Sequence, residues 1–140
     1  MSYSYKYKLK SHPHQSLYNH LSQVTNIAMK THKSHMDNTE IDKFIETVCM
    51  CHDFGKGTIY FQKYLDGAYN GLEKQHGTIS AIFTYWMLSD KWKHLGFLIV
   101  KKHHGNIDNG NDECKKDDVL WRFKKQIDNI KENILFPHVL

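Results

Sequence analysis

Only two prolines occur in this chain of 140 residues, Pro13 and Pro137, one near each end. Proline breaks helix interiors, so the long stretch between them is free to be helical. Hydrophobic residues recur along that stretch at steps of three and four, the spacing of amphipathic helices. We therefore expect helices over residues 15–33, from 37 to the glycines at 55 and 57, and over 58–65, 76–87, 89–104 and 117–135.

Each long predicted helix carries an apolar stripe that should face a common core. The stripes comprise Leu17, Leu21, Val24, Ile27 and Ala28; Ile41, Phe44, Ile45 and Val48; Ile79, Phe83, Trp86 and Met87; Leu95, Leu98, Ile99 and Val100; and Leu120, Phe123, Ile127, Ile130 and Ile134. Asp37 with Glu40 three residues later predicts a capping box. YKYKLK at 5–10 alternates like a strand but is too short to found a sheet. The predicted fold class is an all-α bundle in a single domain over 1–140.

Composition excludes several classes of protein. Hydrophobic residues make up 40% and charged residues 24%, which is typical of a globular domain rather than a disordered chain. No apolar run approaches the roughly 18 residues of a membrane span, so we expect no membrane association. The polar and aromatic start MSYSYKYKLK is not a secretory signal, and three cysteines do not suit a disulfide framework. These features predict a cytoplasmic protein.

Eleven histidines are the most unusual feature of the composition. Five of them, with one aspartate, fall beside apolar stripes or at helix ends of four successive predicted helices: His20, His52 with Asp53, His76, His103 and His104. Each taken singly also fits a hydrogen-bonded residue at a helix end. A metal in the middle of a bundle would supply partners for all of them at once, and their conjunction favours that interpretation. The other histidines lack this placement and are interpreted as surface or loop residues (His12, His14, His32, His35, His94 and His138).

Lys56 lies close behind the His-Asp pair, in the string GKGT at 55–58. A phosphate-binding P-loop would need a glycine where Met50 stands and a strand leading into it, so that interpretation is rejected. A cation at this position would instead hold a phosphate or offset negative charge that develops during a reaction. We therefore expect Lys56 to act beside Asp53 in catalysis.

Four strings together resemble a known family. CHDFGK at 51–56 resembles the signature of HD-superfamily metal-dependent phosphohydrolases. FQKYL at 61–65, QHGTISA at 75–81 and KHH at 102–104 narrow the resemblance to the CRISPR-associated HD nuclease of type I systems. The resemblance is strongest over residues 14–105. It implies a helical HD fold that cuts single-stranded DNA with transition-metal ions.

The resemblance also implies a ligand set. His20, His52 and Asp53 would hold one metal ion, and Asp53 would bridge to a second ion held by His76, His103 and His104. Lys56 matches the lysine that follows the HD pair in the family. Imidazole and carboxylate ligands favour Mn, Fe, Co, Ni or Zn over Mg. We expect two divalent transition-metal ions, and Mn, Ni, Co or Fe before Zn.

The chain departs from the family pattern towards its C-terminus. The family completes the first metal site with an aspartate well downstream of the His-His pair, whereas Asp117, Asp118 and Asp128 follow it too soon to match. We therefore expect an HD bundle truncated at the C-terminus, whose first metal has three protein ligands unless Asp108 or Asp117 completes the site.

Three functions follow as alternatives. The first is a metal-dependent deoxyribonuclease of CRISPR antiviral defence that works with a helicase subunit and the interference complex. The second is an HD phosphohydrolase of nucleotides or cyclic nucleotides, and the third is a catalytically incomplete HD lobe that binds metal, nucleic acid or a helicase. The aromatic side chains of Tyr60, Phe61, Tyr64 and Tyr69, with Lys56 and Lys63, would form a stacking platform for bases, or would pack beneath their loop.

Overall fold

The computed structural model describes residues 9–105 and 117–133. These residues form six α-helices, two short 3-10 helices and a two-stranded hairpin, so the all-α prediction is confirmed. The elements are, in chain order, β1 (Lys10–His12), β2 (Gln15–Ser16), α2 (Leu17–Lys33), α3 (Thr39–Cys51), η1 (Phe54–Gly57), α4 (Ile59–Leu65), η2 (Leu72–Lys74), α5 (Gly77–Met87), α6 (Lys93–His103) and α8 (Asp117–Asn133).

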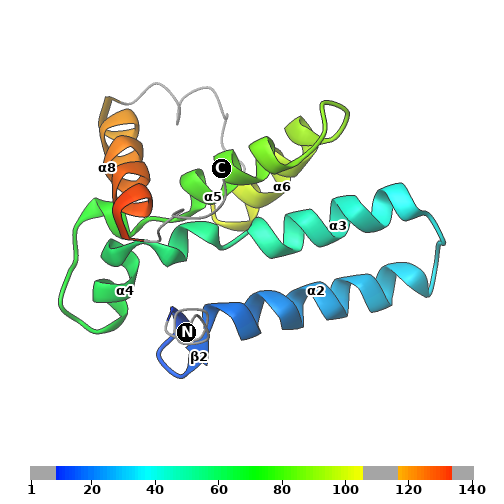
Figure 1. Ribbon diagram of the computed structural model, residues 1–140, viewed down its shortest axis with the longest axis horizontal. Coiled ribbons are helices and arrows are strands. Elements are labelled where there is room, and N and C mark those ends of the chain that lie inside the picture. Colours follow the sequence, from blue (N-terminus) through cyan, green and yellow to red (C-terminus); the bar gives the residue numbers. More distant parts are fainter. Residues whose placement is uncertain (1–8, 106–116, 134–140) are drawn as a thin grey trace.

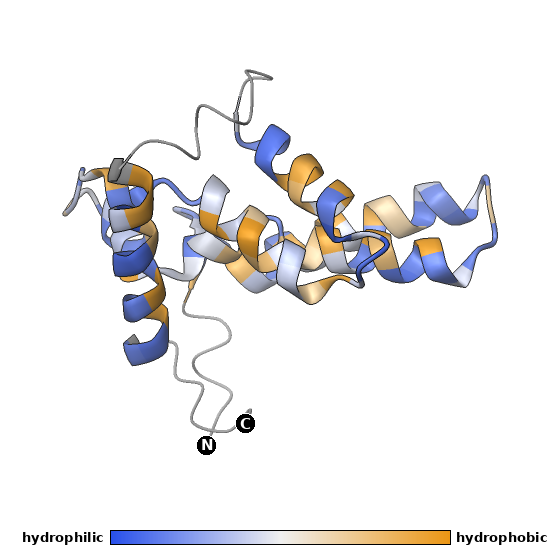
Figure 2. Cartoon of the chain, turned by 90° about the horizontal axis from the view of Figure 1, so that it is seen from above, coloured by the Kyte–Doolittle hydropathy of each residue, from blue (hydrophilic) through white to orange (hydrophobic). Residues whose placement is uncertain are grey.

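Helices α2 and α3 form an antiparallel pair, and α5 and α6 pack together beside α3 (Figure 1). Helix α8 lies next to α4, at the end of the molecule where α2 begins and α3 ends. The helices carry hydrophobic and hydrophilic residues side by side, as amphipathic helices do (Figure 2). The buried core lies between α3, α5 and α6. It consists of Val48, Ala81 and Val100, with Phe44, Leu88 and Phe97 packed against them.

The predicted helix ends are mostly right to within a few residues, with one wrong cap. Asn38, not Asp37, caps α3, and its side chain accepts hydrogen bonds from the backbone N–H groups of Glu40 and Ile41. The capping box does not form, because the Glu40 carboxylate accepts hydrogen bonds from Lys91 and Trp92 ahead of α6. Helix α6 begins at Lys93 rather than at residue 89.

Several predicted core positions are exposed, and these predictions are wrong. Ile27 is 69% exposed while Thr25 beside it is buried, because the far half of α2 has α3 as its neighbour on one side only (Figure 1). Trp86 and Leu120 are likewise exposed, at 79% and 67%. The same is true of Met87, Leu95, Leu98 and Ile99.

His32 was predicted to be a surface residue, and this too is wrong. Its side chain is only 11% exposed and its Nε2 lies 3.2 Å from Asp42 Oδ1, which joins the end of α2 to the start of α3.

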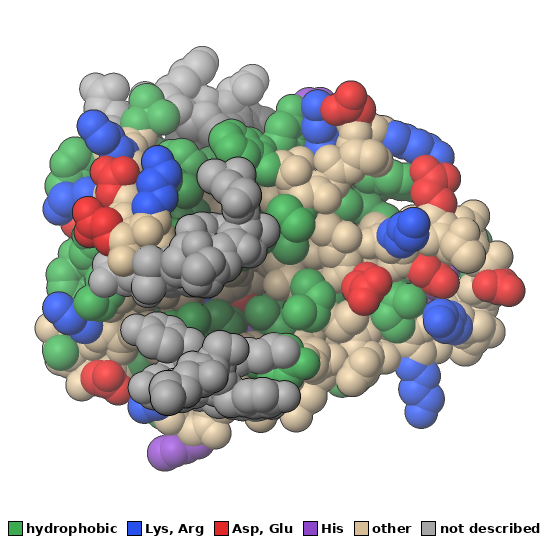
Figure 3. All heavy atoms as spheres, viewed as in Figure 1, with side chains coloured by type: hydrophobic (Ala, Val, Ile, Leu, Met, Phe, Trp, Pro, Cys, Tyr) green, Lys and Arg blue, Asp and Glu red, His purple; other side chains and the backbone are tan. Residues whose placement is uncertain are grey.

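No helix of the described residues is long and apolar enough to cross a membrane. Charged side chains of both signs are interspersed on the face drawn in Figure 3.

Candidate metal centre

Asp53 lies at the centre of the site, in the turn where α3 ends and η1 begins. It is 2% exposed, and His52 before it is 7% exposed. The turn is held against α5, because the Gly55 N–H donates to Ser80 Oγ at 2.9 Å and the ring of Phe54 stacks on that of Phe83. The sequence pattern HD therefore becomes a buried carboxylate fixed between two helices.

A glycine is required in that turn. A Cβ at Gly55 would lie 2.4 Å from Ile79 Cγ2 and 2.7 Å from the His76 carbonyl oxygen. Both separations are far below van der Waals contact, so any larger residue would push η1 away from α5. Gly55 thus keeps Asp53 within reach of the histidine that precedes α5.

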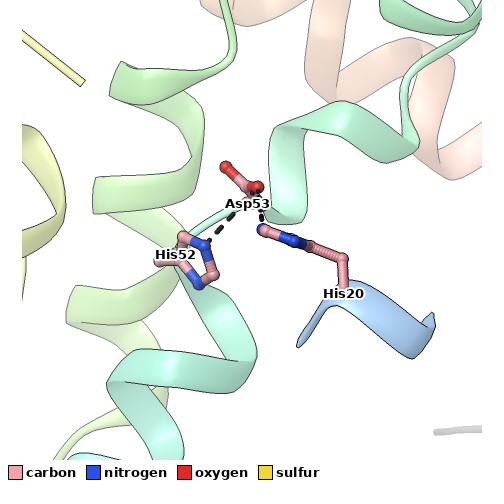
Figure 4. A group of neighbouring side chains, drawn as sticks. All are labelled: His20, His52 and Asp53. Carbon is pink, nitrogen blue, oxygen red and sulfur yellow. Dashed lines mark ion pairs between the residues drawn. The ribbon is translucent and has the colours of Figure 1, made fainter. Parts of the chain in front are cut away.

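His20 approaches Asp53 from α2. The helix begins just before it, where the Ser16 side chain accepts a hydrogen bond from the Asn19 N–H at 3.1 Å. His20 Nε2 lies 3.1 Å from Asp53 Oδ2. Figure 4 shows the imidazoles of His20 and His52 both directed at Asp53.

The orientation of His52 is set by its own helix. Its Nδ1 lies 2.6 Å from the Cys49 carbonyl oxygen, which can only accept a hydrogen bond, so Nδ1 carries the proton. The unprotonated Nε2 then faces Asp53 Oδ2 at 3.5 Å. A backbone carbonyl that fixes the tautomer in this way is typical of histidines that bind metals.

The other carboxylate oxygen, Asp53 Oδ1, faces two histidines at helix ends. His76 precedes α5 and places its Nε2 at 3.5 Å, and His104 follows α6 and places its Nε2 at 3.2 Å. His104 Nε2 is also 2.8 Å from the His52 carbonyl oxygen, which can only accept, so this nitrogen donates a hydrogen bond that a bound ion would have to replace. The ends of α3, α5 and α6 therefore meet at one carboxylate.

Gly77 makes the approach of His104 possible, and sequence reasoning did not single it out. A Cβ at Gly77 would lie 2.5 Å from the Cβ of His104, closer than two side chains can come. The available signal was a glycine at the first position of a helix, directly after a candidate ligand.

His103 is the predicted ligand that the structure does not bring into the cluster. Its side chain is exposed, and its ring centroid lies 5.2 Å from that of His52. His103 is the last residue of α6 and His104 is its C-cap, so the two side chains leave the backbone in different directions. Here His104 is the one that faces Asp53.

Lys56 places a cation on the same carboxylate. Its side chain is buried, and its Nζ lies 2.8 Å from Asp53 Oδ2. The ring of Phe61 covers it, with the Nζ 5.5 Å from the ring centroid. Lys56 therefore contacts the oxygen that also faces His20 and His52.

The electrostatics suit a metal site. Burial alone would raise the pKa of the Asp53 carboxyl, but the contacts from His104, His76 and Lys56 outweigh it and hold that pKa well below its usual range. Burial is the largest influence on His20 and His76 and lowers the pKa of both imidazoles, against the opposing charge of Asp53. At neutral pH Asp53 is thus a charged carboxylate and His20 and His76 are neutral imidazoles, the forms that bind metals.

Two groups of these residues can each hold an ion. The first ligand group is His20, His52 and Asp53, and the second ligand group is Asp53, His76 and His104. Within each group the ligand atoms lie within 4.8 Å of one another. Asp53 Oδ1 and His76 Nε2 are buried and have no hydrogen-bond partner among the described residues. Such atoms are costly to bury unless a partner is supplied, and a cation is the partner that suits both of them. The donor set fits divalent transition metals.

A fourth ligand for the first group is not found among the described residues. Asp108 lies outside them, as do the side chains of Asp117 and Asp118. Asp128 is exposed on α8. Burial raises the pKa of Cys51 to about 11, so this thiol is protonated at neutral pH, and it belongs to neither group of ligand residues.

The predicted stacking platform is only partly available. Phe61 is 5% exposed and packs edge-on against the His76 ring, so it belongs to the support of the site. Tyr64 is 42% exposed, and the Lys74 ammonium lies over its ring.

A buried His-Asp pair at a helix end, surrounded by histidines from three other helix ends, defines the HD class of helical metal-binding domains. Comparison with known proteins gives the family. The family described as "Cas3, HD domain" matches residues 9–135, and the chain belongs to it. This confirms the resemblance drawn from the sequence.

One curated relative is the CRISPR-associated endonuclease Cas3-HD of Pyrococcus furiosus. It is 32% identical over 84 residues, which cover 56% of this chain and 35% of the relative. The chain thus matches about a third of the length of that protein. No solved structure matches the chain significantly.

Proposed function

We propose that this chain is a metal-dependent nuclease that hydrolyses phosphodiester bonds of single-stranded DNA in CRISPR antiviral defence. The observation that carries the proposal is the sharing of one buried carboxylate: Oδ2 of Asp53 faces His20 and His52, while Oδ1 faces His76 and His104. A carboxylate with ligands on both of its oxygens could hold two ions close together, as two-metal hydrolases do. Membership of the Cas3 HD family supports it.

The residues have separate roles in this proposal. Asp53 would bridge two divalent ions of Mn, Ni, Co or Fe, with His20 and His52 on one and His76 and His104 on the other. His103 remains a proposed additional ligand of the second ion. Bound ions would activate a water and stabilise the charge of the phosphate oxygens. Lys56 would add positive charge at Asp53 Oδ2, the side of the carboxylate that its Nζ contacts.

The proposed partners are a separate helicase subunit, which would unwind the duplex, and the type I interference complex. Their support is the family match and the printed name of the relative. The cytoplasm is the proposed compartment for such a complex.

The decisive experiment is a substrate panel with the purified chain. Circular single-stranded DNA, duplex DNA, nucleotides and cyclic nucleotides are incubated with Mn²⁺ or Ni²⁺, with Asp53→Ala as the control for contaminating nucleases. We expect cleavage of the circular single strand that Asp53→Ala does not show. Release of phosphate from nucleotides with intact circular DNA would instead assign a small-molecule phosphohydrolase.

The small number of ligands in the first ligand group supports a second candidate function. Among the described residues that group has three ligands, one fewer than the family pattern. An incomplete site would bind metal, nucleic acid or a helicase without cutting, or would cut only at high metal concentration. A titration of cleavage rate against Mn²⁺ separates the two: saturation at micromolar metal supports a complete site, and no cleavage at any concentration supports the binding lobe.

A further inference from the structure

A cavity of about 560 Å³ opens beside the second ligand group. His76 and His104 form part of its wall, together with the start of α5, the end of α6 and the facing side of α8. An occupant of this cavity would therefore contact the two histidines that face Asp53 Oδ1. None of the described residues that line it is an aspartate or a glutamate.

Two cations line the cavity. Arg122 comes from α8, is 8% exposed, and donates from Nη1 to Gln75 Oε1 at 2.7 Å. No carboxylate of the described residues lies within ion-pair distance of it. Lys101 comes from α6, and its Nζ donates to Thr78 Oγ1 at 2.8 Å.

A buried guanidinium with a neutral amide as partner is an unusual arrangement. Burial of a charge is unfavourable unless a counter-charge is near, and the Gln75 amide offers only a dipole. Arg122 is nevertheless held in place, because Gln126 on the next turn of α8 donates to the carbonyl oxygens of Glu73 and Gln75. Among the described residues, therefore, a guanidinium is fixed at the cavity with no carboxylate paired to it.

The backbone adds positive potential to the same cavity. Helix α5 begins at Gly77, and Gly77 and Thr78 both line the wall. The N-terminus of a helix carries the positive end of its dipole. The Arg122 guanidinium and the N-terminus of α5 therefore face one space, with the Lys101 side chain on its wall, and the described residues that line this space include no carboxylate.

We propose that this cavity is a phosphate subsite, in which Arg122 and Lys101 hold a backbone phosphate of single-stranded nucleic acid next to the phosphate to be cleaved. The inference rests on the proposed nuclease function. Arg122 and Lys101 are positioning residues: they place the strand across Asp53, His76 and His104 and take no part in bond breaking. Contacts to phosphate alone predict binding that is independent of base sequence.

The test measures binding without added metal, so that it does not depend on hydrolysis. Fluorescence anisotropy of a fluorescein-labelled twelve-nucleotide dT strand is recorded over a range of salt concentrations for Arg122→Gln, Lys101→Gln and the wild type. Lys124→Gln is the matched control, because Lys124 is exposed on the same helix and does not line the cavity. We expect about tenfold weaker binding for each subsite variant and less than about twofold for the control.

The salt dependence makes the test specific. For single strands, the slope of log affinity against log salt concentration becomes shallower by about 0.7 for each phosphate contact that is removed. The double variant should therefore have a slope shallower by about 0.7, while Lys124→Gln keeps the wild-type slope. Arg122→Lys retains the charge and should recover most of the binding, which separates a lost contact from a misfolded helix.

Three results would overturn the subsite. In the first, both Gln variants bind the dT strand as tightly as the wild type does. In the second, Lys124→Gln loses as much affinity as the subsite variants do. In the third, the chain binds dTMP or inorganic phosphate tightly and the dT strand does not displace it. Failure of the nuclease proposal is a different result. If the wild type cleaves no DNA with any metal while the Gln variants still lose strand binding, the subsite is supported and the nuclease activity is not.

Discussion

The two ligand groups share the Asp53 carboxylate but surround its oxygens differently. Oδ2 already has a cation, because the Lys56 ammonium lies 2.8 Å from it, with His20 and His52 around it. Oδ1 faces only the imidazoles of His76 and His104 at these distances, and both Oδ1 and His76 Nε2 lack a hydrogen-bond partner among the described residues. An ion at the second group therefore has no ammonium to displace from Oδ1, whereas an ion at the first group competes with Lys56 for Oδ2.

The two groups also differ in what supports them. His52 is oriented by a carbonyl of its own helix, so the first group is preorganised locally. The second group depends on the close approach of α5 and α6 at Gly77. One carboxylate can thus bind two ions with different affinities, and we expect the second group to bind its ion with the higher affinity.

The largest effect should come from Asp53→Ala, which removes the ligand common to both groups. We expect hydrolysis to fall at least about a thousandfold, or about 4 kcal/mol in the activation free energy, with the helical circular dichroism largely retained. Asp37→Ala, in the exposed loop before α3, is the matched control. Retention of more than about a tenth of the rate would contradict a bridging role.

His104→Ala should abolish the tighter of the two metal-binding events. Loss of a residue that merely orients a ligand costs about 10–100-fold in metal affinity, so loss of the ligand itself should cost at least about 100-fold. Isothermal titration with Mn²⁺ or Ni²⁺ measures both events. His103→Ala tests the proposed additional ligand, which lies outside the cluster, and should lower affinity less than His104→Ala does. His35→Ala, exposed after the end of α2, is the control. Equal losses in the two ligand variants would mean that His103 binds the ion as strongly as His104 does.

Lys56→Gln should strengthen metal binding at the first group while weakening catalysis. Removing the ammonium from Oδ2 removes a competing cation, and we expect about a tenfold gain in affinity and about a tenfold loss in rate, each about 1.4 kcal/mol. The affinity is best measured in the His104→Ala background, where only the first group is intact. Lys63→Gln, exposed on α4, is the control. Unchanged affinity would mean that the ammonium does not compete with the ion.

Gly77→Ala should weaken the second group alone, by about three- to tenfold in affinity, because the new methyl group displaces His104. Gly105→Ala is the control on the other side of His104, where an added Cβ would come no closer than 3.8 Å to the Lys101 carbonyl oxygen. Titration of each variant with Mn²⁺ reports both groups. A loss at the first group instead of the second would show that the two groups are not independently supported.

The sequence by itself predicts the helices, the family and, together with His103, the four histidines that the structure gathers around Asp53. Residues at steps of three and four identify helix faces, and His20, His52, His76 and His104 fall beside those faces or at their ends. The adjacent Asp53 and the following Lys56 were found in the same way. Local spacing suffices for these residues because a helix fixes the direction of each side chain relative to its own axis.

Only the tertiary structure decided how the helices meet. Spacing could not tell that Ile27 and Trp86 are exposed, because an apolar face is buried only where a neighbouring helix reaches it. Nor could it choose between His103 and His104, since the rotation of α6 about its axis depends on its packing against α5 at Gly77. The placement of Lys56 on one oxygen of Asp53, and of Arg122 in the cavity beside the other, follows from contacts between segments far apart in the chain. Such contacts leave no periodic pattern in the sequence, because the residues that make them come close only after the helices have packed.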